Sequence, residues 1–225
     1  MPLQAFAPGV WIAEGTPIKA ALGFRYPIRM AVLQVEDGGL LLWSPVQPEL
    51  LLVAEIAAMG PVRALIAPNK LHHVFLKDWA AHFPQAEIHA APGLASKRDD
   101  LTISGTLHDL APMGWEGVEV QLVPNSIAPE AVLFHRASAT VLICDLLQNM
   151  PGDWYHGWRR LLAQLDQMME LHPTVPRKFR FALGAEAKAP LVRMLGWPAE
   201  RVLMAHGTPV TRDGQAFLQR AFAGL

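Results

Sequence analysis

The sequence has little of several features that identify common classes of protein. Its one cysteine, Cys144, cannot form an internal disulfide, so the chain is not a small fold held together by disulfides. No stretch approaches the roughly 18 apolar residues that a membrane span requires. Residues 1–6 lack the basic start and the long apolar segment of a signal peptide. We therefore expect a cytoplasmic protein with no transmembrane segment, and Cys144, which ends the apolar run 139–144, fits a reducing compartment.

A strong excess of charge of either sign is also absent. The net charge of −1 argues against a nucleic-acid-binding protein that depends on a basic surface. The chain has no internal repeat, no low-complexity segment, no convincing Ser-His-Asp arrangement and no Gly-rich loop of the kind that cradles phosphates. Of its 225 residues, 52% are hydrophobic and 17% are charged, which predicts a globular protein with a substantial core. We interpret residues 1–225 as one domain.

Short apolar runs separated by turns predict many short strands and helices. The predicted strands are residues 9–14, 26–35, 40–44, 62–67, 87–90, 118–123, 130–135, 140–144 and 201–205. The predicted helices are residues 48–59, 74–82, 154–171, 188–195 and 213–222, with residues 15–23 as a loop, Gly60 as a C-cap and Asp213 as an N-cap. The elements fall into two groups of strands followed by helices, which favours an α/β sandwich of two sheets covered by helices.

Groups able to bind a metal follow three of the predicted strands. His72 and His73 come shortly after residues 62–67, Asp145 follows residues 140–144, and His206 follows residues 201–205. A mixed set of imidazole and carboxylate ligands is typical of zinc, iron or manganese, and such a metal lowers the pKa of bound water. These residues are far apart in the sequence, so they form a site only if the fold brings the ends of the strands together.

In this order and setting, the residues resemble the metallo-β-lactamase superfamily, and within it an uncharacterised branch. The resemblance covers residues 9 to about 150, and His206 extends it to the end of the chain. It is carried by Tyr26-Pro27-Ile28-Arg29-Met30, Gly39-Leu40, Trp43-Ser44-Pro45-Val46, Pro68-Asn69, Leu71-His72-His73, Pro92-Gly93-Leu94, Phe134-His135, Ser138, Asp145-Leu146 and Asn149. The resemblance implies a four-layer αββα sandwich of two mixed sheets flanked by helices, with a metal site on one edge and a small-molecule substrate.

The chain departs from the metal-binding motif of this superfamily, His-x-His-x-Asp-His. When the last His of the motif is placed on His73, its Asp falls on His72 and its first two histidines fall on Pro68 and Lys70. The mid-chain His ligand is expected near residues 124–126, where the chain has no histidine. The resemblance therefore implies a single or altered site.

The remaining ligands match the second metal site of the superfamily. They are His72, His73, Asp145 and His206, or a set of three with only one of the adjacent histidines. Lys70 could supply positive charge in place of the missing first metal. The alternative is that no metal is bound and that Asn69, His73, Asp145 and His206 form a hydrogen-bonded polar network.

Further residues are candidates for the surrounding pocket, namely Asn69, Lys70, Arg29, His135 and Asn149. Arg29 could bind an anionic substrate or form a structural ion pair. His135 could line the pocket or be a strand residue whose ring is satisfied by neighbours. Asn149 could line the pocket or form a turn.

The sequence thus supports three hypotheses. The first is a metal-dependent hydrolase that acts on an ester, thioester, amide or phosphoester bond. The second is a non-catalytic binding or regulatory protein on the same scaffold, with an eroded metal site. The third is an interaction module, such as a homodimer, that uses the Trp-rich helix around Trp154 and Trp158, although core packing explains those side chains as well.

Overall fold

The computed structural model describes residues 2–108, 114–169 and 173–225, which form two sheets packed face to face. The first sheet has seven strands in sequence order: β1 (Gln4–Ala7), β2 (Val10–Lys19), β3 (Arg25–Gln34), β4 (Leu40–Trp43), β5 (Val62–Ala67), β6 (Glu87–Ala90) and β7 (Gly105–Thr106). Its pairs are antiparallel from β1 to β4 and parallel from β4 to β7.

The second sheet has four strands in the order β11 (Arg201–Met204), β10 (Thr140–Ile143), β9 (Glu130–His135) and β8 (Val118–Val123). Strands β10 and β11 are parallel, and the other two pairs are antiparallel. Both sheets are therefore mixed. The carboxyl ends of β10 and β11 lie at the same edge of the second sheet.

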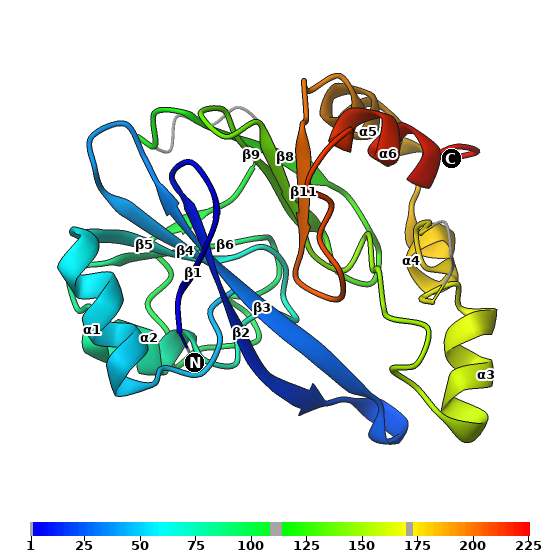
Figure 1. Ribbon diagram of the computed structural model, residues 1–225, viewed down its shortest axis with the longest axis horizontal. Coiled ribbons are helices and arrows are strands. Elements are labelled where there is room, and N and C mark those ends of the chain that lie inside the picture. Colours follow the sequence, from blue (N-terminus) through cyan, green and yellow to red (C-terminus); the bar gives the residue numbers. More distant parts are fainter. Residues whose placement is uncertain (1, 109–113, 170–172) are drawn as a thin grey trace.

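Helices cover the outer face of each sheet (Figure 1). Helices α1 (Leu50–Met59) and α2 (Leu76–His82) lie against the seven-stranded sheet, and α4 (Arg177–Ala182), α5 (Lys188–Leu195) and α6 (Gly214–Ala221) lie on the side of the four-stranded sheet. Helix α3 (Gly157–Leu165) lies at the lower right of the view, and two 3-10 turns, Ala21–Gly23 and Ala185–Ala187, complete the elements. No helix in the described ranges is long and apolar enough to cross a membrane.

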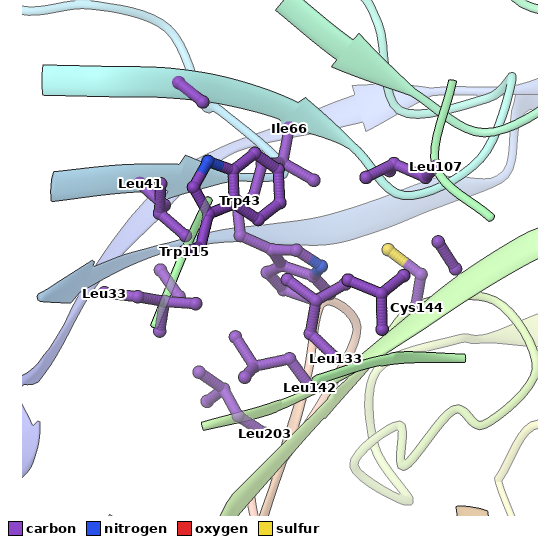
Figure 2. Close-up of a cluster of buried hydrophobic side chains, with 14 of the residues drawn as sticks. Leu33, Leu41, Trp43, Ile66, Leu107, Trp115, Leu133, Leu142, Cys144 and Leu203 are labelled. Carbon is purple, nitrogen blue, oxygen red and sulfur yellow. The ribbon is translucent and has the colours of Figure 1, made fainter. Parts of the chain in front are cut away.

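The alternation of side chains along the strands produces three apolar layers. Leu33, Leu41 and Trp43 point between the sheets, where they meet Leu133 and Leu142 (Figure 2). Their neighbours along the first sheet point outward and pack on α1 and α2, through residues such as Ile56 and Trp79. Outward residues of the second sheet pack in the same way on α4, α5 and α6. The αββα architecture implied by the resemblance is thus confirmed.

The predicted loop at residues 15–23 is wrong over its first half. Strand β2 continues to Lys19, where it pairs with Arg25, so β2 and β3 form a long hairpin that extends beyond the sheet toward α3 (Figure 1). Gly15 and Pro17 disfavour a strand locally, but pairing with β3 overrides this preference. At the tip of the hairpin, Phe24 packs on the Tyr155 ring at 5.1 Å between centroids.

Other elements also differ from the predictions. Helix α3 is shorter than the predicted 154–171, since Gln167 has a φ of 61° that a helix does not allow, and residues 170–171 lie outside the described residues. Asp213 precedes α6 but makes no capping hydrogen bond, because its own backbone is left-handed at a φ of 56°. Gly60 does occupy the C-cap of α1. Strands β1 and β7 and helix α4 were not predicted.

Candidate metal centre

The three predicted sites meet at one edge of the sandwich. His72 lies in the loop after β5, in the seven-stranded sheet, while Asp145 and His206 directly follow the ends of β10 and β11, in the four-stranded sheet. Within the described part of the chain, these three residues form a group whose ligand atoms all lie within 4.8 Å of one another. The carboxyl ends of neighbouring strands are where α/β folds place ligand sites.

The distances within this group fit a shared cation better than direct hydrogen bonds. The Nε2 atom of His72 lies 3.5 Å from Asp145 Oδ2, and the Nε2 atom of His206 lies 3.4 Å from Asp145 Oδ1. Both separations exceed the usual 2.7–3.2 Å of an N–H···O bond. Ligands placed about 2.1 Å from a tetrahedral ion lie about 3.4 Å from one another.

The other ring nitrogen of each histidine has a partner of its own. His206 Nδ1 lies 2.7 Å from the backbone oxygen of Pro27, which can only accept, so Nδ1 carries a proton. The Nε2 atom is the ring nitrogen of His206 that faces Asp145, 3.4 Å from its Oδ1. His72 Nδ1 lies 2.8 Å from Ser44 Oγ. Partners of this kind fix the orientation of metal-binding histidines.

Asp145 is buried and held from several sides. Asn69 Nδ2 donates to its Oδ2 at 2.9 Å, and Gln148 Nε2 donates to its Oδ1 at 3.2 Å. Burial raises the pKa of Asp145, but the contacts with His206 and His72 outweigh it and hold the pKa well below its usual value. Burial lowers the pKa of His72 despite the nearby carboxylate. An ionised Asp145 and a neutral His72 are the protonation states that bind metal.

The sequence reasoning missed Glu130, which fixes the backbone at Asp145. Its Oε1 accepts the N–H of Cys144 at 2.7 Å, and its Oε2 accepts the N–H groups of Asp145 and Leu146 at 2.8 and 3.1 Å. Burial, reinforced by the charge of Asp145, raises the pKa of Glu130 to about 8, while the backbone N–H groups oppose the shift. The only signal in the sequence was an acidic residue that begins an apolar strand.

Asn69 occupies the turn that leads to His72. Its Oδ1 accepts the N–H of Leu71 at 2.8 Å, as asparagine does in tight turns, while its Nδ2 reaches Asp145 and, at 3.3 Å, Glu130. This residue is fully buried. Asn69 is not among the residues that line the cavity, and its contacts give it a structural role, since it joins the loop after β5 to the end of β10.

Arg29 supports the site rather than facing its cavity. Its Nη1 donates to the backbone oxygens of Met204 and Gly207, at 2.6 and 2.7 Å, and so braces the chain on both sides of His206. Its Nε donates to Glu14 at 2.6 Å. Of the two roles predicted for Arg29, the structure favours the structural ion pair.

Asn149 and Gly207 join the loops that follow β10 and β11. Asn149 Nδ2 donates to the backbone oxygen of Thr208 at 2.7 Å, so the asparagine stabilises a turn. Gly207 has a φ of 95°, and a Cβ atom there would collide with the backbone of Asn149. Glycine at position 207 is therefore required for this close approach.

His73 lies outside the three-residue group. Its Nδ1 and its backbone oxygen each lie 2.9 Å from Arg98 Nη1. Burial and the positive charges of Lys97 and Arg98 lower the pKa of His73 to about 4. The side chain still lines the same cavity as His72.

Two other predicted pocket residues do not line this cavity. His135 ends β9, which runs antiparallel to β10, so it lies at the opposite end of the sheet from Asp145. There its Nε2 lies 3.0 Å from the backbone oxygen of Gln34, and its Nδ1 lies 2.8 Å from Ser138 Oγ. The alternative of a satisfied strand residue is correct for His135. The side chain of Lys70 passes Gly93 and is not part of the cavity lining.

The cavity at the site has a volume of about 440 Å³, within the usual range for small-molecule sites. Its floor holds His72, Asp145 and His206, and its walls include Ile28, Phe75 and Phe179. Sequence reasoning missed Tyr26 and Lys178, which also line it. An apolar cavity with a few converging polar groups can bind a small organic molecule next to the candidate metal ligands.

Comparisons with known proteins support this architecture. A family model described as a domain of unknown function, DUF4336, matches residues 10–101. No curated protein matches the sequence. A solved metallo-β-lactamase from Pontibacter korlensis is 14% identical with a TM-score of 0.65, over 97% of this chain and 95% of that chain. Another, from Hirschia baltica, is 12% identical with a TM-score of 0.63, over 100% and 99% of the two chains. A flavodiiron core from Synechocystis is 15% identical with a TM-score of 0.61, over 97% of this chain and 59% of that chain.

The chain has the metallo-β-lactamase superfamily fold. The matching family model, a domain of unknown function, covers less than half of the chain. At the positions where the resemblance places the first two histidines of the His-x-His-x-Asp-His motif, this chain has Pro68 and Lys70.

Proposed function

We propose that the protein is a hydrolase that uses one divalent metal ion, held by His72, Asp145 and His206. The observation that carries the proposal is the convergence of these three side chains, with each histidine Nε2 atom 3.4–3.5 Å from an oxygen of Asp145 and the Nδ1 atom of His206 held by the backbone oxygen of Pro27. The metal would be zinc, iron or manganese, which accept this mixture of ligands. The catalytic unit would be the single domain 1–225, and the buried thiol of Cys144 supports a cytoplasmic location.

The metal ion and the residues around it would each have a separate role. A bound metal ion would supply Lewis acidity and a lowered pKa for water. Asp145 would remain ionised, and Asn69 and Gln148 would hold its carboxylate in position. Ser44 would orient the ring of His72 through Nδ1. The apolar walls of the cavity would exclude bulk water from an ester, thioester, amide or phosphoester bond placed beside these groups.

Metal content is the direct test of this proposal. Protein purified without added metal should hold close to one ion per chain, and the Asp145→Ala, His206→Ala double variant should hold almost none. His82→Ala, which removes an exposed histidine outside the site, is the matched control and should retain the ion. Equal, near-zero metal in the wild-type protein and the double variant would contradict the proposal.

His73→Ala separates the two proposed ligand sets. Retention of the metal supports the set of His72, Asp145 and His206, since His73 already contacts Arg98. Loss of the metal in His73→Ala, with His82→Ala unaffected, would instead require His73 as a fourth ligand.

Hydrolysis should be screened with a panel of small esters, thioesters, amides and phosphoesters. Any activity that depends on the site should disappear with chelator, return with metal and be absent from the Asp145→Ala variant. Activity that persists in chelator would contradict a metal-dependent reaction.

A second candidate is a non-catalytic binding protein on the same scaffold. It is favoured by the fact that both carboxylate oxygens of Asp145 already accept hydrogen bonds, from Asn69 and Gln148. The polar network could therefore persist without an ion. Absence of metal together with ligand binding in the cavity would favour this candidate over the hydrolase.

A homodimer through α3 is a separate proposal, because Trp158 and Leu161 are 51% and 59% exposed on that helix. A molecular mass that stays monomeric over a hundredfold range of concentration would contradict it.

A further inference from the structure

Tyr26 and Lys178 form a polar pair inside the cavity that the sequence motifs do not explain. Tyr26 lies near the start of β3, and its ring centroid is 5.3 Å from that of His206. Lys178 lies on α4, and its Nζ is 3.2 Å from the Tyr26 hydroxyl oxygen. Both side chains line the cavity with Asp145. The pair therefore lies beside the candidate metal ligands without belonging to them.

The ammonium group of Lys178 is held in place and charged. Asp166 Oδ2 lies 3.2 Å from Nζ, and Asp166 Oδ1 accepts the backbone N–H of Lys178 at 2.9 Å. The third neighbour of Nζ is the sulfur of Met168 at 3.8 Å, which is a weak acceptor. Burial acts to lower the pKa of Lys178, but Tyr26 and Asp166 outweigh it and raise the pKa above its usual value.

The Tyr26 hydroxyl has a proton left to donate. In residues 2–108, 114–169 and 173–225, its one hydrogen bond is the one it accepts from Lys178. A phenol both donates and accepts, so its O–H remains available to a ligand in the cavity. The adjacent ammonium group withdraws electron density from the hydroxyl oxygen and strengthens it as a donor.

The charges around the cavity favour an anion. Its lining includes three lysines, namely Lys19, Lys97 and Lys178, and one carboxylate, Asp145. Lys19 and Lys97 are exposed, whereas Lys178 is half-buried. The carboxylate is engaged by Asn69 and Gln148 and would be neutralised further by a metal. Positively charged clefts with apolar walls attract anions and bind them more strongly than an open surface does.

We propose that the cavity binds a small organic acid whose anionic oxygen accepts hydrogen bonds from the Tyr26 hydroxyl and the Lys178 ammonium group, while its apolar body lies against Ile28, Phe75 and Phe179. The inference extends the proposed function, because it assigns the substrate class of the same cavity. The shared chemistry is an anionic oxygen, which a carboxylate or a phosphate can provide.

The test compares matched ligands on chelator-treated protein, in which no metal can bind the anion. Phenylacetate and phenylacetamide have nearly the same shape and differ in charge, and their dissociation constants can be measured by titration in two-dimensional NMR spectra. We expect phenylacetate to bind at least about tenfold more tightly, the fold-change that corresponds to 1.4 kcal/mol. Phenyl phosphate is a third probe, which distinguishes the two kinds of anion. If it binds more tightly than phenylacetate, the preferred ligand of the cavity is a phosphate. If it binds less tightly, the preferred ligand is a carboxylate.

Variants test whether Tyr26 and Lys178 cause the difference in affinity between the two ligands. Tyr26→Phe and Lys178→Met should each weaken binding of phenylacetate about five- to tenfold and weaken binding of phenylacetamide much less, because its neutral amide oxygen accepts weaker hydrogen bonds. Lys188→Met, which removes an exposed lysine on α5, should change neither. Tyr26→Phe removes a single oxygen atom, so it remains informative if Lys178→Met does not fold.

Equal affinity for phenylacetate and phenylacetamide, or no change in Tyr26→Phe, would overturn the inference. Both outcomes are independent of metal content, so failure of this inference and failure of the proposed hydrolase can be told apart.

Discussion

The carboxylate of Glu130 holds Asp145 in place through the backbone, with its Oε2 2.8 Å from the Asp145 nitrogen. The same carboxylate also accepts the N–H groups of the residues on either side. A buried acid in β9 thus sets the conformation of the chain as it leaves β10, which is where the candidate metal ligand must point. The position of Asp145 depends on a residue 15 positions away in the sequence.

We predict that at pH 9, above the pKa of about 8 at which Glu130 ionises, Glu130→Gln lowers the free energy of unfolding by about 2–3 kcal/mol, because the amide would place an N–H donor against a backbone N–H donor in a buried site. Urea unfolding measures the change. Glu200→Gln replaces an exposed acid and is the matched control, for which we expect a change within about 0.5 kcal/mol. Equal stability of Glu130→Gln and wild type would show that the backbone at Asp145 does not need the carboxylate.

Metal binding should raise the thermal stability of the protein. An ion that binds only the folded chain, present at about 100 times its dissociation constant, adds about 2.7 kcal/mol. For a chain of 225 residues this corresponds to a rise in Tm of roughly 5–10 °C. Differential scanning fluorimetry with chelator and with added zinc measures the shift. The shift should vanish in His206→Ala and persist in His82→Ala, and an equal shift in both variants would locate the metal elsewhere.

Arg29→Lys should weaken metal binding about 10- to 100-fold, as changes to groups that orient metal ligands usually do. Lysine cannot reproduce the planar guanidinium that bonds the backbone on both sides of His206 and also contacts Glu14. Competition with a chromophoric chelator measures the affinity. Arg63→Lys, in an exposed pair with Asp37, is the control. Unchanged affinity in Arg29→Lys would mean that the loop holds His206 without this arginine.

His135 should contribute to the loss of folding stability at acidic pH. Burial holds its pKa below the usual value of 6.5, although the contact with Gln34 opposes the shift. The unfolded chain therefore binds a proton at a higher pH than the folded chain. The stability contributed by neutral His135 is present above pH 6.5 and is lost as the pH falls below that value.

The measurement for His135 is the difference between urea midpoints at pH 7 and pH 5. That difference should be smaller in His135→Gln than in the wild-type protein. His156→Gln, which changes an exposed histidine, should keep the wild-type difference. Equal differences in wild type and His135→Gln would contradict the prediction.

The sequence predicted the strand ends well because apolar runs such as residues 62–67 and 140–144 end in turn-forming or polar residues. It could not predict which of His72 and His73 faces Asp145. That choice depends on the conformation of a loop whose turn is closed by Asn69. Adjacent side chains on an irregular loop have no fixed periodicity from which to infer direction.

Local sequence patterns could not predict other parts of the site. Residues 178–181 alternate basic and apolar side chains, a spacing that gives no helical signal, so α4 and its Lys178 were missed. Tyr26 and Ser44 were known only as positions within larger motifs. Their roles come from contacts with Lys178 and His72, which are 152 and 28 residues away. Such partners depend on the fold and not on neighbouring residues.

The candidate ligands come from both sheets, with His72 from one and Asp145 and His206 from the other. An ion bound there would add a link between the two sheets, beside the hydrogen bonds of Asn69 and Arg29 that already join them. Loss of the ion would loosen this edge of the sandwich more than its interior. Amide hydrogens at the ends of β5 and β11 would then exchange with solvent sooner than those at the centre of the same strands.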